Sequence, residues 1–341
     1  MTSGIRVLMV TSDWLWNSWG GPAVFIARQA EFLRREGVQV DLFPFKAQRR
    51  LRNYAAAWRE VHRRLEHGSY DLVHAQFGQS GLTALPRRVP LVVTFRGDDL
   101  EGIIGENGRY TPAGWLLRVL SRLVARHADA AIVVSEHLKR HLPSWVDAKV
   151  LPSGIDLDLF HPEPAGQARL RLGLPADQRL VLFVGNPGLA RKRYGLAQAA
   201  VSIVNRSMPT RLVVGWERPH REIAALMNAC DALVFTSLQE GSPNAVKEAL
   251  ACNLPVVSVP VGDVPIRLQG VEGCELCPDD RAEAIAASLE RVLRRGERTE
   301  GRKAVNDLDE RLLTRRLIGI YSSVLPGSRS SACWPGLAAA S

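Results

Sequence analysis

Short apolar runs alternate with longer amphipathic stretches along most of the chain. In the first half the apolar runs fall at residues 7–10, 38–43, 72–75, 91–95 and 130–134, and each has the length of a buried strand. In the intervals, for example over residues 22–35 and 114–126, apolar positions recur every three or four residues, which predicts helices. Strands that alternate with helices favour a parallel sheet with right-handed crossovers. The first half therefore predicts an α/β domain.

The same alternation begins again after residues 152–164, a segment punctuated by proline and glycine. Predicted strands follow at residues 180–184, 211–214, 232–235, 256–259 and 275–277. Predicted helices lie at residues 196–205, 222–229, 244–251 and 281–295, with a last helix near residues 302–324. A length of 341 residues suits two domains. We expect an N-terminal domain over residues 1–162, a C-terminal domain over 163–301 and a disordered, Ser-, Gly- and Ala-rich tail over 326–341.

Composition narrows the class of protein. There is no run of about 18 apolar residues and the first residues do not resemble a signal peptide, so we expect a cytoplasmic protein. The odd number of cysteines, five, agrees with a reducing compartment. Cys274 and Cys277 form a C-x-x-C pair inside a predicted strand, and no second pair accompanies them. We interpret them as core cysteines rather than as a zinc or redox site.

The formal net charge of +9 favours acidic partners such as nucleotides or anionic lipids. Part of this charge lies in a basic segment from Lys46 to Arg64. An apolar stripe at helical spacing opposes its arginines: Leu51, Tyr54, Trp58, Val61 and Leu65. Two interpretations stay open, a helix that packs on the core with a solvated basic face, or a peripheral helix that rests on an anionic membrane. Binding of nucleic acid is not favoured, because no nucleic-acid motif accompanies the charge.

The loop over residues 237–243 carries the most informative chemistry, because it follows a predicted strand and leads into a predicted helix. Open parallel sheets bind ligands at the carboxyl ends of their strands. Ser242 is a suitable N-cap and Pro243 a suitable first helical residue. The free N–H groups from Asn244 and Ala245 onward would then face a diphosphate. Glu240 before the helix and Glu248 within it would grip separate hydroxyl groups of one extended ligand; the alternative is a capping loop with a solvated helix glutamate.

A second loop, residues 185–193, also follows a strand and places three cations after a glycine-rich turn. Cations beside a leaving diphosphate offset the negative charge that develops as the bond to the sugar breaks. The alternative is a solvated basic loop. In the first half, Arg96 and Asp98 follow the strand at residues 91–95, and Asp98 or Asp99 would orient an acceptor hydroxyl or serve as a capping residue.

The segment from Glu240 to Glu248 resembles the E-x7-E motif of the retaining glycosyltransferases of family 4, which have the GT-B fold. Residues 231–237 and 248–257 resemble the strand before this motif and the helix, turn and strand after it, and residues 152–156 resemble the segment before the interdomain linker. Weaker similarity lies at residues 71–74 and 93–95. The resemblance implies two Rossmann-like domains whose parallel sheets face a central cleft, with a C-terminal helix at about residues 302–325 that returns to complete the first domain.

The resemblance also implies roles for individual residues. Glu240 would hold hydroxyls of the donor sugar and Glu248 the ribose hydroxyls of the nucleotide. The backbone from residue 241 to 245 would lie near the sugar and diphosphate: Gly241, Ser242, Pro243, Asn244 and Ala245. The second loop and the first domain would supply the rest of the donor site: Gly185, Asn186, Arg191, Lys192, Arg193, Arg96 and the N-terminal glycine loop at Gly20 and Gly21.

The chain departs from the family pattern at three places. Asn186 stands where an arginine is usual, so Arg191 or Arg193 would supply the second cation beside Lys192. Arg96 stands where many members carry a histidine. Between Val214 and His220 the chain is shorter than is typical by about one βα unit, a region that usually frames the nucleobase.

Together these features predict a retaining, metal-independent glycosyltransferase that moves a sugar from a nucleotide donor to a glycan or lipid-linked acceptor of the cell envelope or of an exopolysaccharide. No cofactor is expected, and no D-x-D pair follows a core strand, since Asp156 and Asp158 lie in the linker. Two alternatives stay open: a GT-B nucleotide-sugar epimerase, for which Arg96 and Asp98 are the candidate groups, and a donor-binding GT-B protein without turnover.

Overall fold

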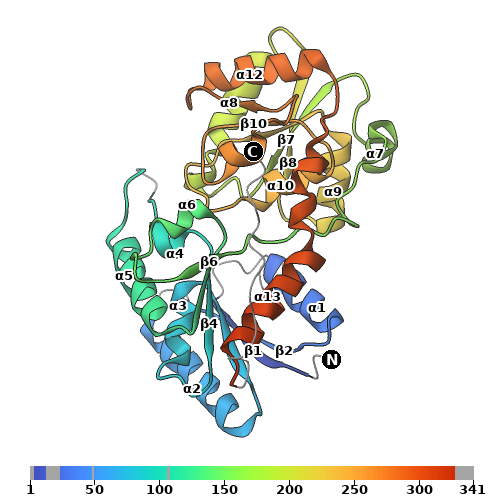
Figure 1. The fold of residues 1–341 in the computed structure, drawn as a ribbon. Helices are drawn as coiled ribbons and strands as arrows, with labels where there is room; N and C mark the ends of the chain where they lie inside the picture. The colour runs from blue at the N-terminus through green and yellow to red at the C-terminus, as the bar shows by residue number, and fades with distance from the viewer. Residues whose placement is uncertain (1–3, 13–23, 48–49, 106–107, 327–341) are drawn as a thin grey trace.

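The computed structural model describes residues 4–12, 24–47, 50–105 and 108–326. It contains two parallel sheets, each flanked by helices, and the two α/β domains predicted from the sequence are confirmed (Figure 1). The first sheet has the strand order β2-β1-β3-β4-β5-β6. Its strands are β1 (Arg6–Ser12), β2 (Gln39–Phe45), β3 (Leu72–Gln76), β4 (Leu91–Phe95), β5 (Ala130–Val133) and β6 (Ala148–Val150). The sequence pattern missed only the three-residue β6 among these.

The first sheet is covered on both faces, as its continuous apolar strands require. On β1, Val7 and Met9 pack into one hydrophobic cluster, and Leu8 and Val10 pack into another on the opposite face. The helices of this half are α1 (Val24–Arg35), α2 (Leu51–His67), α3 (Gly78–Gly81), η1 (Leu82–Ala84), α4 (Asp98–Glu101), α5 (Pro112–His127) and α6 (Glu136–Lys139). Helix α1 lies on the first face, whereas α2 and α5 share the second.

The second sheet has the strand order β11-β10-β9-β7-β8. Its strands are β7 (Arg179–Val184), β8 (Thr210–Gly215), β9 (Ala232–Phe235), β10 (Val256–Ser258) and β11 (Glu275–Leu276). The helices around it are α7 (Ala165–Leu172), η2 (Ala190–Lys192), α8 (Tyr194–Val204), α9 (His220–Ala229), α10 (Asn244–Ala251), α11 (Val264–Leu268) and α12 (Ala282–Arg295). All strand pairs are parallel, so the loops after β7 and β9 leave the sheet at the same edge.

The prediction of a single helix near residues 302–324 is wrong. A 3₁₀ helix, η3 (Gly301–Leu308), is followed by α13 (Glu310–Val324), and the two meet at Asp309, whose carboxylate accepts a hydrogen bond from the Arg311 N–H at 2.7 Å. The break has a tertiary cause. The Ile155 N–H donates to the Leu308 carbonyl and the Glu310 N–H donates to the Ile155 carbonyl, each at 2.8 Å, so the interdomain linker occupies groups that a continuous helix would use.

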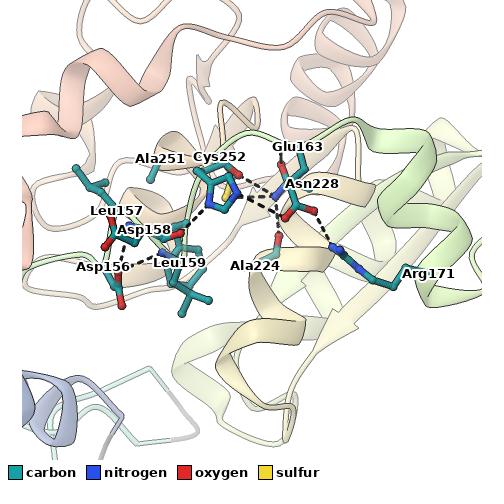
Figure 2. A network of polar contacts seen from close by, with 12 residues as sticks. Asp156, Leu157, Asp158, Leu159, Glu163, Arg171, Ala224, Asn228, Ala251 and Cys252 are labelled. Carbon is teal, nitrogen blue, oxygen red and sulfur yellow. Dashed lines mark hydrogen bonds and ion pairs between the residues drawn. The ribbon is translucent and has the colours of Figure 1, made fainter.

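The linker between the sheets is held by polar contacts of its own (Figure 2). The Asp156 carboxylate accepts hydrogen bonds from the N–H groups of Asp158 and Leu159, both at 3.1 Å, which closes a turn. Further on, Asn228 of α9 accepts from the Glu163 N–H at 2.9 Å and donates to the His161 carbonyl at 3.0 Å. The linker is therefore fixed to the second domain by its backbone.

Helix α13 runs alongside α1 and packs on the first sheet (Figure 1). Leu317, Ile320 and Tyr321 are buried, and the Tyr321 hydroxyl lies 2.7 Å from Nδ1 of His74 on β3. The expected domain boundaries at residues 162 and 301 stay predictions. The expected tail lies outside the described residues apart from Pro326. None of the helices in the described ranges combines the length and the apolar character needed to span a bilayer.

The basic segment forms α2, and its apolar stripe is only partly used. Val61 is buried, and Tyr54 and Leu65 pack partly buried against the same cluster, whereas Leu51 and Trp58 are exposed. On the polar face, Glu60 accepts hydrogen bonds from Arg63 at 2.8 Å and from Arg64 at 2.7 Å. These contacts favour the interpretation of α2 as a core-packing helix.

Leu317→Ala is expected to lower the free energy of unfolding by roughly 2–5 kcal/mol, because it removes a fully packed side chain between α13 and the first domain. Chemical denaturation followed by circular dichroism measures the loss. Leu312→Ala on the same helix is the matched control, since this side chain is 38% exposed and should cost much less. Equal losses for the two variants would contradict the assigned packing of α13.

Candidate functional site

The carboxyl ends of β4 and β9 meet at the junction between the two domains. Gly241 follows β9, and a Cβ atom placed on it would lie 2.6 Å from the carbonyl oxygen of Arg96, which follows β4. Only glycine permits this approach. Two residues earlier, Gln239 donates its side-chain amide to the Gly102 carbonyl at 2.9 Å. The loop after β9 is therefore seated directly against the first domain.

Glu240 lies at this junction and is bound by two cations of the second domain. Its Oε1 lies 2.6 Å from Lys192 Nζ and 3.0 Å from Arg191 Nη1. The side chain is 14% exposed, and burial alone would raise its pKa. Lys192 and Arg191 more than offset this, so the pKa of Glu240 falls below its ordinary value and the group stays ionised at neutral pH.

The two cations are positioned by the neighbouring loop. Thr236 donates its hydroxyl to the Lys192 carbonyl at 2.9 Å, and the Leu238 N–H donates to the Arg191 carbonyl at 2.8 Å. Gly185 follows β7 with a φ of 142°, and a Cβ there would lie 3.3 Å from the Lys192 side chain. The ends of β7 and β9 thus place one carboxylate and two cations together.

The structure distinguishes between the two candidates for the second cation. Arg191 contacts Glu240, whereas Arg193 points to the Thr236 carbonyl at 2.6 Å and pairs with Asp280. Asn186 does not reach the carboxylate either, because its Oδ1 accepts the Gly188 N–H at 2.9 Å within its own turn. Arg191 and Lys192 are therefore the two cations that contact Glu240.

Asp98 and Asp99, adjacent in sequence at the start of α4, have different surroundings. Asp99 is buried and accepts hydrogen bonds from the N–H groups of Gly78 and Gly97 at 2.9 Å, so it fixes the loop structurally. Asp98 lies within electrostatic range of Arg191, Glu240 and Lys192 across the junction. Burial, with a contribution from the Glu240 charge, raises the pKa of Asp98 above its ordinary value.

Arg96 is held by the first domain and the linker. Its guanidinium donates to Gln76 Oε1 at 2.6 and 2.9 Å and to the Ser153 hydroxyl at 2.6 Å, and it lies 4.6 Å from the centre of the Phe25 ring. Burial lowers its pKa to about 10. Arg96 is therefore fixed between the first domain and the linker, and its predicted contact with the donor stays a prediction.

The predicted capping role of Ser242 is wrong. Helix α10 begins at Asn244, and Pro243 occupies the N-cap position without a side-chain cap. Ser242 instead donates its hydroxyl to Asp263 at 2.8 Å, which ties the loop to the segment before α11. The first-turn N–H groups of Asn244 and Ala245 still lack an intrahelical acceptor, as at any helix start. The predicted glycine loop at Gly20 and Gly21 lies outside the described residues.

Glu248 is buried, 4% exposed, at the point where α10 meets the first domain. Its Oε1 lies 3.2 Å from His220 Nε2 and 3.6 Å from Arg28 Nη1. Burial would raise its pKa, but His220 and Arg28 hold it below the ordinary value. Glu240 and Glu248 therefore lie in separate charge clusters, both at the interdomain junction.

Sequence reasoning missed Arg28, Lys247 and Glu310. Arg28 of α1 also donates to Glu310 of α13 at 3.0 Å and to the Gly154 carbonyl at 2.6 Å. Lys247 donates its ammonium group to the Ser153 carbonyl at 2.9 Å, and burial lowers its pKa to about 8. The signal present in the sequence was a charged residue on the apolar face of each helix, which requires a buried partner.

One group in the described ranges has the spacing of metal ligands: Glu101, His137 and His141, whose ligand atoms all lie within 4.8 Å of one another. The Glu101 Oε1 to His137 Nε2 distance of 2.7 Å is that of a hydrogen bond, which accounts for this pair without an ion. Cys274 and Cys277 remain free thiols, and burial raises their pKa values, to about 11 for Cys274, so they behave as core residues.

Each half of the chain matches a family of known glycosyltransferases. Residues 3–154 match the family described as glycosyl transferase 4-like domain, and residues 181–295 match glycosyl transferases group 1. The chain is 29% identical, over 65% of its length, to the protein named teichuronic acid biosynthesis glycosyltransferase TuaC of Bacillus subtilis. It is 29% identical, over 61% of its length, to the D-inositol 3-phosphate glycosyltransferase of Mycobacterium bovis. It spans 61% and 51% of the lengths of these two relatives.

Solved structures share the fold. Sucrose-phosphate synthase from Thermosynechococcus elongatus superposes with a TM-score of 0.78 at 19% identity, over 93% of this chain and 98% of the other. HepE of Anabaena, solved with UDP and glucose, superposes with a TM-score of 0.67 at 16% identity, over 94% of this chain and all of the other. The arrangement of two facing parallel-sheet domains is thus that of the GT-B fold.

Glu240→Gln is expected to destabilise the protein by roughly 2 kcal/mol at pH 7, because two partly buried cations lose their carboxylate. Folding lowers the pKa of Glu240, so its contribution is present above the ordinary value of 4.5 and disappears as the pH falls through the folded-state pKa. The difference between the variant and the wild type should therefore shrink on acidification.

Urea denaturation at a series of pH values measures this difference. Glu283→Gln, which alters an exposed carboxylate on α12, is the control and should show little change at any pH. A difference for Glu240→Gln that stays constant from pH 7 to below 4 would show that the carboxylate is not held by the cations.

Proposed function

Because the chain belongs to the GT-B glycosyltransferases of family 4, we propose that it is a retaining, metal-independent transferase that moves a sugar from a nucleotide donor to a glycan or lipid-linked acceptor. One observation carries the proposal: Glu240, Lys192 and Arg191 converge at the ends of β7 and β9, opposite Asp98 of the first domain. This set combines a carboxylate that can accept hydrogen bonds from sugar hydroxyls with two cations that can bind a diphosphate.

The chemistry follows from what each group does. The Glu240 carboxylate accepts hydrogen bonds from donor-sugar hydroxyls, which fixes the sugar over the loop after β9. Lys192 and Arg191 contact the diphosphate and stabilise the negative charge that grows on it as the glycosidic bond breaks. A diphosphate oxygen takes the proton of the acceptor hydroxyl, which attacks the same face of the sugar that the diphosphate leaves. Two protein cations at the leaving group supply the charge stabilisation that a metal ion would otherwise supply.

The first domain supplies the acceptor side. Asp98 lies within electrostatic range of the Glu240 cluster, and burial is the main cause of its raised pKa, with a smaller contribution from the Glu240 charge. Its carboxyl group orients an acceptor hydroxyl by a hydrogen bond, while Asp99 holds the α4 loop in place. Transfer in this scheme does not depend on a strongly basic side chain, because the departing diphosphate is the proton acceptor.

The second charge cluster is assigned to the nucleoside. Glu248 at α10 accepts hydrogen bonds from the ribose hydroxyls, and His220, 3.2 Å from it, exchanges this partner for the ligand. The likeness of the fold to HepE, which was solved with UDP-glucose, supports a UDP-sugar donor. The similarity to TuaC, named for teichuronic acid biosynthesis, supports an acceptor among cell-envelope polymers.

Lys192→Ala is expected to lower kcat by roughly a hundredfold to a thousandfold, with a smaller change in KM for the donor, because the cation acts mainly on charge that develops in the transition state. Glu240→Ala is expected to abolish transfer, while its thermal unfolding midpoint stays above the assay temperature so that the variant is still folded. Radiolabelled sugar transfer from a verified donor measures both. Arg193→Gln is the matched control and should lose far less, because this side chain is directed at Asp280.

The donor can be identified by ligand-induced stabilisation. Among UDP-, GDP-, ADP- and TDP-sugars, a UDP-sugar should raise the unfolding midpoint most, since a ligand at about 100 times its Kd adds roughly 2.7 kcal/mol of stability. Incubation of that donor without an acceptor separates the alternatives, because an epimerase would convert it and a transferase would not. Binding without transfer to any acceptor in a panel, with wild-type protein, would leave a donor-binding protein and refute the transferase.

A further inference from the structure

Helix α5 exposes an apolar face to solvent. Trp115, Leu116, Val119 and Leu123 are between 42% and 64% exposed, and they recur at the three- and four-residue spacing of one helix face. The opposite face, which includes Gly114, Ser121 and Val124, is the buried one. Single exposed apolar residues are ordinary, but a contiguous stripe of large ones marks an interaction surface.

The charged residues of α5 itself all have one sign. The sequence of α5 contains no acidic residue, and Arg118, Arg122 and Arg126 accompany the apolar face along the helix. Two further large aromatic side chains are exposed nearby in the sequence of the same domain, Tyr110 just before the helix and Trp145 after α6. An apolar helix face with aromatic residues and arginines is the composition of helices that lie in the interface of an anionic bilayer.

The position of α5 connects this face to the functional site. A Cβ on Gly114 would lie 2.2 Å from the Ile103 backbone nitrogen, so α5 is pressed against the segment that follows α4. In that segment, the Gly102 carbonyl accepts the Gln239 amide of the loop that carries Glu240. A partner that bound the exposed face of α5 would therefore contact the domain that carries Asp98, one helix away from the junction.

We propose that the exposed face of α5 docks the protein on an anionic membrane, with Trp115, Leu116, Val119 and Leu123 in the lipid interface and the exposed Arg126 beside the head groups. That the docked membrane also supplies a lipid-linked acceptor rests on the proposed function. Docking itself does not depend on that function. It also moves the expected membrane contact from α2, whose stripe packs partly on the core and whose Arg63 and Arg64 pair with Glu60, to α5.

A second copy of the chain fits this face less well than a membrane. Self-association through α5 under twofold symmetry would place the same helix opposite itself and bring its arginines together without a carboxylate from either α5 to offset them. The net charge of +9 acts in the same direction, since it opposes the approach of another copy and favours an anionic surface.

Cosedimentation with vesicles tests the proposal on the full chain without donor or acceptor. The wild type should bind vesicles of phosphatidylcholine mixed with phosphatidylglycerol more tightly than vesicles of phosphatidylcholine alone, and added salt should weaken the binding. Trp115→Ser combined with Leu116→Ser should reduce binding to the anionic vesicles by about tenfold or more, because two side chains no longer enter the interface. Leu170→Ser, at an 85% exposed leucine on α7 of the second domain, is the matched control and should bind like the wild type.

Each outcome decides the proposal. Absence of binding by the wild type, equal loss in the Leu170→Ser control, or binding that the α5 variant retains would each overturn it. So would a dimer, detected by sedimentation velocity, that the α5 substitutions dissociate, because a second copy would then cover this face. Stabilisation of the α5 variant by a UDP-sugar reports on the donor site separately, so failure of docking and failure of the transferase proposal remain distinguishable.

Discussion

The geometry of the junction depends on two segments that cross between the domains side by side. The linker residue Ile155 exchanges backbone hydrogen bonds with Leu308 and Glu310 of the returning chain, and Arg302 donates to linker carbonyls at Leu157 and Phe160. A single flexible connection would leave the orientation of the sheets undetermined, whereas two paired crossings restrict it. The contact of Gly241 with the Arg96 backbone, and with it the position of Glu240, follows from that restriction.

Buried charge strengthens the same junction. Arg28 from α1 reaches Glu310 of α13 and Glu248 of α10, and Lys247 reaches the carbonyl of Ser153. Charges so far from water are stable only with partners in place, because an unpaired buried ion costs several kcal/mol. The cluster therefore favours the observed approach of the domains.

The Glu240 cluster has a different character, because in the proposed function its charges bind a ligand as well as stabilise the fold. The Glu240 carboxylate partly neutralises the charge of both cations, so Lys192 and Arg191 are held in position before any diphosphate binds. Preorganised charge of this kind avoids reorganisation during reaction. In the proposed scheme the first domain carries both Asp98 and the exposed face of α5, so the acceptor side of the reaction lies on one domain and the Glu240 cluster on the other.

The sequence by itself determined the strands of the described residues apart from β6, the presence of two α/β domains and the loops after β7 and β9, because periodicity and turn chemistry are short-range properties of the chain. Only the tertiary structure decided that Arg191 and not Arg193 meets Glu240, that Asp309 interrupts the last helix and that Arg28 pairs with Glu248. These outcomes depend on contacts between residues far apart in the chain. The exposed stripe of α5 is of the same kind, since an apolar helix face does not reveal in sequence whether a sheet or solvent lies against it.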